Sequence, residues 1–231
     1  MVERVQEAMY IGPFMIKLGW IAVAIAGLFA YLAIKKRLEG QGGIRHVVID
    51  DLSSAAFYGF MIWKFSFILF HPSTIADNPI AIVYFTGGER GMWLAILFSV
   101  YFLYRQSRRR RISFWIYADV VIVGLLVYLS AASLFPIIDR LEWWNPYMVQ
   151  LSLSFMLLMW VWRKPSGVGH PEDTVHAWLW FCMGQVFYHF FDPYHKTILF
   201  GLSMEQWIFL MIAVVCVFLP NMKRKHRFNE S

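Results

Sequence analysis

The sequence is poor in charge. Only 16% of its 231 residues are Asp, Glu, Lys or Arg, whereas a typical soluble domain carries about 25%. Hydrophobic residues make up 59% of the chain and aromatic residues 19%. This composition argues against an ordinary soluble domain. It indicates a lipid-embedded protein, in which Trp and Tyr gather where the chain crosses the two membrane interfaces.

Cysteine is also scarce. The two cysteines, Cys182 and Cys216, both lie within apolar runs, and we interpret them as small buried hydrophobic residues without a redox or metal role. No cleavable signal peptide is evident, because the stretch MVERVQEAMY is as acidic as it is basic and the next apolar run is long enough to span. No linker or internal repeat stands out, so we expect one membrane domain over residues 1–231 and disfavour an inverted-repeat transporter.

The net charge of +6 could suggest nucleic acid, but the distribution of the charge predicts otherwise. Most of the 21 Lys and Arg fall in four clusters that flank apolar stretches: Lys35-Lys36-Arg37 with Arg45, Arg105 with Arg108 to Arg111, Arg163-Lys164, and Lys223-Arg224-Lys225 with Arg227. This pattern is typical of positive-inside topology. Binding of RNA by SRRRR is the weaker alternative, and we expect no nucleic-acid partner.

Seven apolar segments lie between these clusters, at roughly 14–34, 48–70, 85–104, 114–134, 147–162, 175–191 and 204–220. A helix needs about 20 residues to cross a bilayer, and helices satisfy their own backbone in lipid. The basic clusters follow the first, third, fifth and seventh segments. The sequence therefore predicts an all-α polytopic membrane protein with seven transmembrane helices, the N-terminus outside and the C-terminus cytoplasmic.

The third segment begins with an unusual stretch, YFTGGERG. The apolar run from Gly91 to Tyr104 covers only about 21 Å at 1.5 Å per residue, against about 30 Å of hydrocarbon. Thr86, Gly87 and Gly88 would then line a polar cavity, because irregular backbone at membrane depth needs protein or water around it. Glycines chosen for tight helix packing are the equal alternative.

Several ionisable residues lie within or beside the segments. Lys64 is placed deep enough to require either snorkelling to the outer interface or contact with an anion such as a lipid phosphate. Asp50, Asp51 and Asp119 lie at the inner ends of their segments, close to the basic loops. We expect these acids to pair with the nearby arginines, since a proton path would need further acids deeper in the spans.

Gln185 and His189 are four residues apart and so share one helix face. His189 is the only group at that level whose ordinary pKa suits acid–base work near neutrality. A metal site in HFFDPYH matches no strong zinc pattern. Interfacial hydrogen bonding and a catalytic or lipid-binding role both remain open for His189.

Together these groups predict a polar site open to the outer leaflet. The candidates for binding lipid phosphate are Lys64, Thr86, Gly87, Gly88, Arg90, Ser133, Arg140 and Gln185, with His189 as the candidate catalytic base. Because the available charges are cationic, we expect an anionic phospholipid head group as the ligand. We expect no cofactor and no metal.

Several motifs, taken in order, resemble the bacterial prolipoprotein diacylglyceryl transferases over roughly residues 10–220. They are IGPFMIKLGW, DDLSSAAFYGFMIWKFSFILF, YFTGGERG, NPYMVQ and LFGLSMEQW. The resemblance implies seven spans with the N-terminus outside, in a bacterial plasma membrane. It also implies a site for phosphatidylglycerol that includes the glycine pair, and transfer of a diacylglyceryl group to a lipobox cysteine.

The chain departs from the family at its polar positions. The family's histidine before the glycine pair is Thr86, and a family arginine falls on Lys64, which keeps the charge but loses the bidentate fork. The arginine after the fourth span falls on Ser133, the arginine of the sixth span on Gln185, and the acid four residues later on His189. Losing several groups that act as a unit leaves little catalysis.

Three functional hypotheses follow. The first is a divergent paralogue with altered or lost catalysis that still binds phosphatidylglycerol, another anionic phospholipid or a lipoprotein. The second is an active transferase with a rebuilt site, in which His189 is the base and Lys64, Arg90 or Arg140 holds phosphate. The third is a non-enzymatic subunit of a membrane complex, with a membrane protein as its partner.

Overall fold

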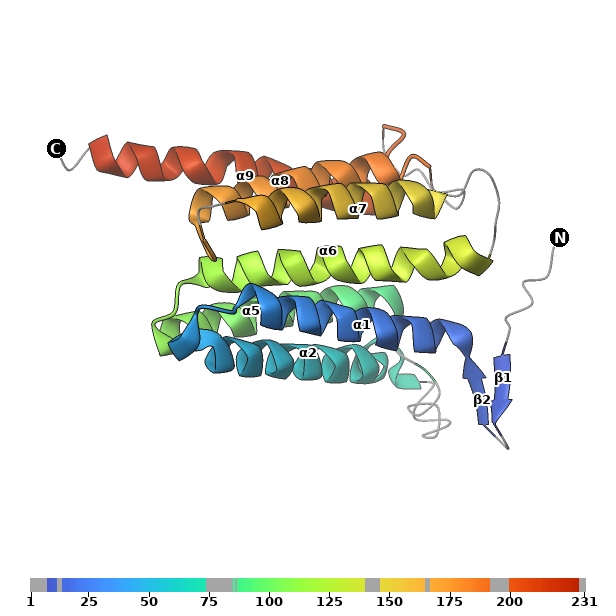
Figure 1. Cartoon of the computed structure of the whole chain (residues 1–231). Coiled ribbons are helices and arrows are strands. Elements are labelled where there is room, and N and C mark those ends of the chain that lie inside the picture. The colour runs from blue at the N-terminus through green and yellow to red at the C-terminus, as the bar shows by residue number, and fades with distance from the viewer. Residues whose placement is uncertain are drawn as a thin grey trace. The chain divides into compact units, whose positions relative to one another are not determined.

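The structure, a computed structural model, describes residues 8–11, 14–73, 85, 87–139, 146–164, 167–191 and 200–228. These ranges contain seven α-helices and one two-stranded hairpin (Figure 1). The helices are α1 (Leu18–Arg37), α2 (Gly42–Phe70), α5 (Gly88–Arg110), α6 (Phe114–Asp139), α7 (Pro146–Arg163), α8 (Pro171–Tyr188) and α9 (Met204–Phe228). The prediction of a helical fold is confirmed, since each apolar segment corresponds to one of these helices.

The hairpin is a departure from the sequence prediction. Strands β1 (Ala8–Ile11) and β2 (Phe14–Lys17) pair antiparallel, from Ala8 opposite Lys17 to Ile11 opposite Phe14. The prediction of helix from residue 14 is therefore wrong over residues 14–17. The sequence offered a signal for this, because a Gly-Pro dipeptide, which commonly marks a turn, separates the two strands.

Several helices are longer than their apolar runs. Helix α2 begins six residues before the predicted start at residue 48, and α5 continues to Arg110 rather than ending at residue 104. The apolar run marks only the part of a helix that is suited to hydrocarbon. Lys and Arg are good helix formers, so a helix can continue through its basic end.

The chain divides into two compact units, Met1–Arg37 with Ala118–Ser231, and Leu38–Tyr117. The second unit is built on the pair of α2 and α5, which lie side by side (Figure 1). Small residues line their contact: the Ser99 hydroxyl donates to the Ala55 carbonyl at 3.2 Å, and a Cβ on Gly59 would lie 2.6 Å from Ser99 Oγ. Small residues spaced four apart let helix backbones approach closely in lipid.

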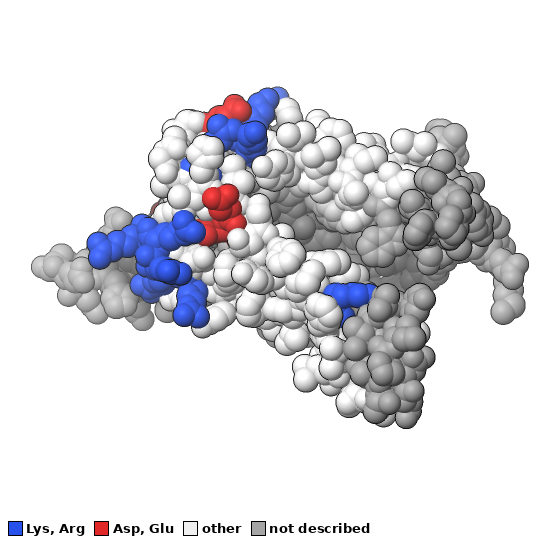
Figure 2. Space-filling view, turned by 90° about the horizontal axis from the view of Figure 1, so that it is seen from below, with Lys and Arg blue, Asp and Glu red and all other residues white. Residues whose placement is uncertain are grey.

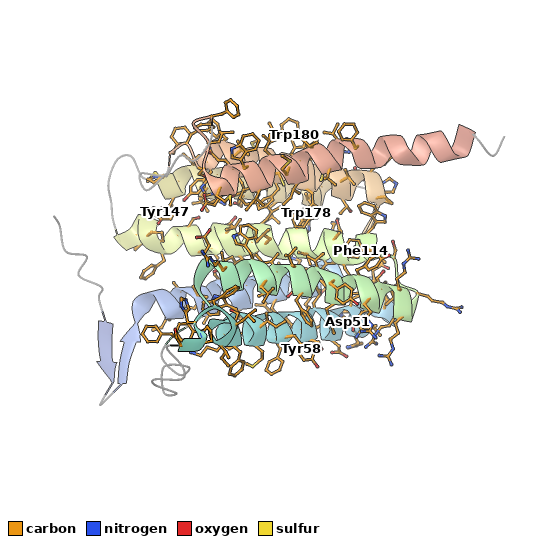
Figure 3. The ribbon with its side chains drawn as sticks, turned by 180° about the vertical axis from the view of Figure 1, so that it is seen from behind. Asp51, Tyr58, Phe114, Tyr147, Trp178 and Trp180 are labelled. Atoms are coloured by element: carbon orange, nitrogen blue, oxygen red, sulfur yellow. The ribbon has the colours of Figure 1, made fainter. Side chains whose placement is uncertain are left out.

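The first unit has its core between α6, α7, α8 and α9. The core cluster consists of Ile122, Val123, Leu126, Val161, Ala177, Phe181, Cys182 and Ala213. The indole N–H of Trp178 donates to the Ala118 carbonyl at 3.2 Å, which fastens α8 to α6 (Figure 3). Both cysteines are buried and free, as expected for small hydrophobic residues.

The outer surfaces of the helices are largely apolar. Large hydrophobic side chains such as Met156, 71% exposed, and Leu97, 69% exposed, face away from the helix contacts. Charged residues cover little of the described surface in Figure 2. Within the described part of the chain, two helices, Gly42–Phe70 and Phe114–Ile138, are by length and composition apolar enough to cross a membrane. Soluble monomers rarely expose contiguous apolar patches above a few hundred Å².

Candidate functional site

The glycine pair lies where α5 begins against α2. The backbone N–H of Gly87 donates to the Trp63 carbonyl at 3.0 Å, and the Trp63 indole N–H donates to the Gly88 carbonyl at 3.2 Å. Gly88 has a φ of +60°, a conformation that glycine adopts without the steric cost of a Cβ. These two bonds fix the start of α5 to one turn of α2.

The two helices approach so closely here that side chains are excluded. A Cβ on Gly87 would lie 1.7 Å from Ser66 Oγ and 2.8 Å from the Trp63 carbonyl oxygen, and one on Gly91 would lie 2.1 Å from Ser66 Oγ. Of the two explanations for the glycine pair, tight helix packing therefore holds at Gly87 but not at Gly88, where nothing lies within 4 Å of a Cβ; Gly91 packs as closely as Gly87. Thr86, which the sequence placed in the same polar corner, lies outside the described residues.

Lys64 belongs to the same corner. Its ammonium donates to the Phe85 carbonyl at 3.2 Å, and the Phe85 ring stacks on Phe67 with centroids 5.3 Å apart. The Lys64 ammonium thus provides a hydrogen-bond donor to a backbone carbonyl just before the N-terminus of α5. Arg90 follows in the first turn of α5 and is exposed. The structure brings Lys64, Gly87, Gly88 and Arg90 together at one end of the α2–α5 pair.

Gln185 belongs to a buried polar chain in the other unit. Its amide N–H donates to Gln150 Oε1 at 3.3 Å, and the Gln150 amide donates to Ser154 Oγ at 3.3 Å. All three side chains are buried. Gln150 and Ser154 were missed as site residues, although a glutamine within the apolar run of α7 is itself a signal, because buried amides need hydrogen-bond partners.

His189 follows the last residue of α8. Its backbone N–H donates to the Gln185 carbonyl at 3.1 Å, and its half-buried ring stacks on Phe209 of α9 with centroids 6.0 Å apart. Helix α9 begins with a capping box. The buried Gln206 side chain accepts from the Ser203 backbone N–H at 2.8 Å, and Ser203 Oγ accepts from the Gln206 backbone N–H. The Gln206 amide also donates to the Val186 carbonyl at 3.0 Å, which joins α9 to α8.

Ser133 makes a bond within its own helix. Its hydroxyl donates to the Leu129 carbonyl at 2.7 Å, and the residue is 4% exposed. Arg140, the other candidate near the end of α6, lies outside the described residues. Ser133, Gln185 and His189 therefore belong to one unit, and Lys64 with the glycine pair to the other.

A groove of about 440 Å³ opens beside Gln185, among α6, α7 and α8. Its walls are Leu126, Leu153, Met156, Leu157, Trp160, Trp180, Phe181, Met183, Gly184 and Phe187, with Ser154 and Gln185 as its polar members. No residue of this described lining is charged. The groove suits an elongated apolar molecule, with an amide and a hydroxyl available to a polar group at one level.

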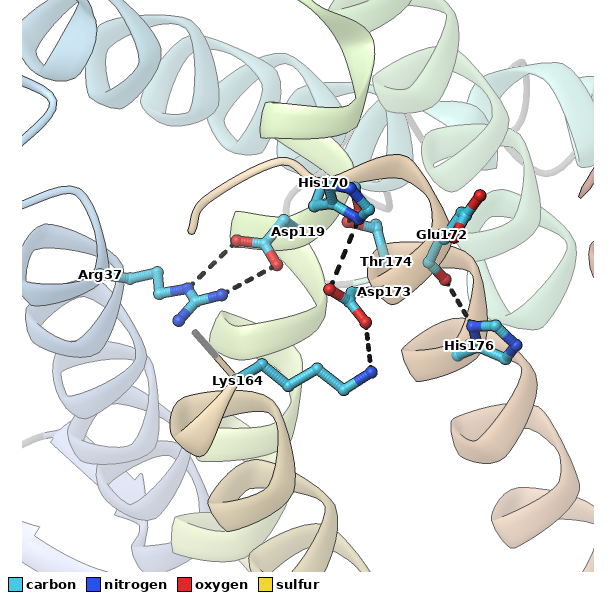
Figure 4. Close-up of polar contacts among 8 residues, drawn as sticks. All are labelled: Arg37, Asp119, Lys164, His170, Glu172, Asp173, Thr174 and His176. Atoms are coloured by element: carbon cyan, nitrogen blue, oxygen red, sulfur yellow. Dashed lines mark hydrogen bonds and ion pairs between the residues drawn. The ribbon is translucent and has the colours of Figure 1, made fainter. Parts of the chain in front are cut away.

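Ion pairs gather where helices begin or end beside basic clusters. Arg37 forms two bonds with Asp119, at 3.1 and 3.2 Å, and Lys164 pairs with Asp173, which also faces His170 at 3.5 Å (Figure 4).

In the other unit, Asp51 accepts from the Tyr117 hydroxyl at 2.7 Å and pairs with Arg110 at 3.1 Å. The expected pairing with arginines is confirmed for Asp51 and Asp119, whereas Asp50 is exposed and pairs with no arginine of the described residues. Asp51 and Asp119 have a structural role in holding helix ends together.

No protein-family model matches the chain, and no curated protein matches it significantly. The resemblance to the diacylglyceryl transferases therefore rests on the sequence motifs alone.

Proposed function

We propose that this chain is a multi-pass protein of the bacterial plasma membrane, with seven spans, the N-terminus outside and the C-terminus cytoplasmic. The apolar outer surfaces of the helices support embedding in lipid. The basic ends of α1, α5 and α7, where Lys or Arg occupy the last turn, support the orientation.

We further propose that the protein binds phospholipid and has lost or altered the catalysis of the diacylglyceryl transferases that it resembles. The contacts of the candidate groups support this. The Lys64 ammonium is bonded to a carbonyl, the Ser133 hydroxyl to its own helix, and the Gln185 amide to Gln150. Catalysis requires donors and bases aimed at the reacting atoms instead of at structural partners.

The groove beside Gln185 is the observation that carries the proposal of lipid binding. Its uncharged, aromatic- and methionine-rich lining matches an acyl chain better than a phosphate. Gln185 lies about 18 Å along α8 from Asp173, at 1.5 Å per residue, which is beyond the middle of about 30 Å of hydrocarbon. The lining also includes Trp160, three residues before Arg163 at the basic end of α7, so the groove extends into both halves of the bilayer and does not select a leaflet.

The test is photocrosslinking in nanodiscs. The protein is reconstituted with phosphatidylglycerol that carries a diazirine in one acyl chain, irradiated, digested and mapped by mass spectrometry. We expect crosslinks concentrated on α7 and α8 at groove residues such as Met156 and Met183. Crosslinks spread evenly over the exposed apolar residues of all helices would contradict a specific groove.

A matched pair of variants makes this test sharper. Gly184→Leu fills the groove, since Leu153 lies at an ordinary contact distance of 3.8 Å from a Cβ there, and should lower crosslinking several-fold. Gly27→Leu adds the same side chain on α1, where nothing lies within 4 Å of a Cβ, and should leave it unchanged. Equal crosslinking in both variants would refute the assignment.

A further inference from the structure

The corner between α5 and α6 is built by unusual backbone and side-chain contacts. Helix α5 ends at Arg110, and the next residue, Arg111, has a left-handed φ of +56°. The Ser107 carbonyl accepts the Ile112 N–H at 3.2 Å, and the Ser107 hydroxyl donates to the Ile112 carbonyl at 2.7 Å. Ser107 therefore makes two hydrogen bonds to the backbone of Ile112 and so holds the two ends of the turn together. Phe114, labelled in Figure 3, then begins α6.

A cavity of about 550 Å³ opens at this corner. Its polar lining consists of Tyr104, Ser107, Arg108, Arg111 and Ser113, and Trp115 stands at its side. None of the described residues that line it is acidic. The cavity therefore holds two guanidinium groups and two serine hydroxyls beside a large aromatic ring.

The four consecutive arginines differ in what they contact. Arg110 pairs with Asp51 at 3.1 Å, so its charge is used within the fold. Arg108 donates from Nε and Nη2 to the Tyr104 hydroxyl, at 3.2 and 3.1 Å, and lies over the Tyr104 ring at 5.5 Å. This bracing orders the Arg108 fork at the cavity. Arg109 is exposed and is not part of the lining.

An apolar stripe on α5 leads to this cavity. Leu97, Tyr101, Tyr104 and Arg108 follow at spacings of three and four residues, so they share one helix face. All four side chains are exposed. The stripe is suited to acyl chains, and it ends at a guanidinium fork whose geometry matches phosphate.

We propose that this corner binds the head group of an anionic phospholipid, with phosphate between Arg108 and Arg111 and the acyl chains along the α5 stripe. The two guanidinium groups, which pair with no acid among the described residues, provide the charge complementarity, and the stripe favours a lipid over a free phosphate. Basic pockets beside cytoplasmic helix ends recognise such head groups. The site lies at the basic end of α5, belongs to a different unit from the groove beside Gln185, and rests on the proposed membrane embedding alone.

Native mass spectrometry in a non-ionic detergent tests the proposal. The full-length protein is titrated with short-chain phosphatidylglycerol, with phosphatidylcholine of the same chain length, and with glycerol 3-phosphate. We expect phosphatidylglycerol to bind at least tenfold more tightly than either of the others. Equal binding of the two lipids would overturn recognition of charge, and equal binding of glycerol 3-phosphate would replace the lipid site by a soluble-anion site.

Variants locate the binding. Arg108→Gln and Arg111→Gly should each lower the affinity for phosphatidylglycerol about tenfold, as expected for loss of one charge-assisted contact. Arg109→Gln removes the same charge outside the cavity and should change affinity less than twofold. Equal losses of affinity in all three variants would overturn the proposal, because they would show that the lipid is attracted by the total charge of the arginine cluster instead of by this cavity.

Folding of the variants is checked by thermal denaturation. Glycine adopts the positive φ of position 111 without the steric cost of a Cβ, so the melting temperature of Arg111→Gly should not fall. Failure of the wild-type protein to enter nanodiscs would refute the proposed membrane function. Entry with normal groove crosslinking, but without preference for phosphatidylglycerol in the titration, would refute only this inference.

Discussion

Removing the carboxylate of Asp51 should destabilise the α2–α5 unit through one particular bond. Asp51 is 1% exposed and Tyr117 is 0% exposed, and the Tyr117 hydroxyl donates to Asp51 Oδ2 at 2.7 Å. Arg110, the other partner, has a side chain that is 40% exposed. In Asp51→Ala the buried tyrosine hydroxyl loses its acceptor, whereas the arginine can turn to water.

The two contacts differ in expected magnitude. A hydrogen bond to a charged group contributes about 1.5–3 kcal/mol, while an ion pair with an exposed partner contributes about 0–1 kcal/mol. The free energy of unfolding should therefore fall by about 1.5–4 kcal/mol in Asp51→Ala. Arg110→Gln should cost less than Asp51→Ala, because the Asp51 carboxylate keeps the hydrogen bond from the Tyr117 hydroxyl.

A double-mutant cycle isolates the bond. Asp51→Ala, Tyr117→Phe and the double variant are unfolded by SDS titration in mixed micelles and followed by circular dichroism. We expect a coupling of about 1.5–3 kcal/mol, larger than the roughly 0.6 kcal/mol of an average side-chain hydrogen bond between membrane helices. A coupling near zero, or a loss in Arg110→Gln as large as in Asp51→Ala, would refute the reasoning.

Two other substitutions test the packing and the ion pairs. Gly87→Ala places a Cβ 2.8 Å from the Trp63 carbonyl oxygen and should lower the free energy of unfolding by about 1–3 kcal/mol through overpacking. Gly42→Ala is the control, since nothing lies within 4 Å of a Cβ there, and it should not lower the melting temperature. Equal melting temperatures of the two variants would contradict the close approach of α2 and α5. Arg37→Gln leaves the 5%-exposed Asp119 side chain without its cation. The free energy of unfolding should fall by about 3–5 kcal/mol in the same SDS titration. A fall below about 1 kcal/mol would indicate that water reaches Asp119.

Much of the helical fold could be predicted because apolar length and basic ends are local properties. The seven apolar segments each correspond to a helix, and the acids near the basic loops pair with arginines as expected. The hairpin over residues 8–17 was missed because its β-strands are only four residues each. Short apolar runs do not separate strand from helix by periodicity.

The candidate site was less predictable because it depends on contacts between distant residues. Sequence alone could not decide whether Gly87 lines a cavity or a helix contact, since that depends on Ser66, which is far away in the chain. The partner of Gln185 is Gln150, 35 residues earlier on another helix. The groove likewise arises from three helices, and no single segment encodes it.

The most direct test of the account asks whether the protein transfers a diacylglyceryl group. The purified protein is reconstituted in phosphatidylglycerol vesicles with a lipobox peptide that carries its cysteine, and the mass of the peptide is followed. We predict no gain in mass, while a diacylglyceryl transferase modifies the peptide in the same vesicles. A gain of one diacylglyceryl group, lost in His189→Ala, would contradict the account and establish an active enzyme with a rebuilt site.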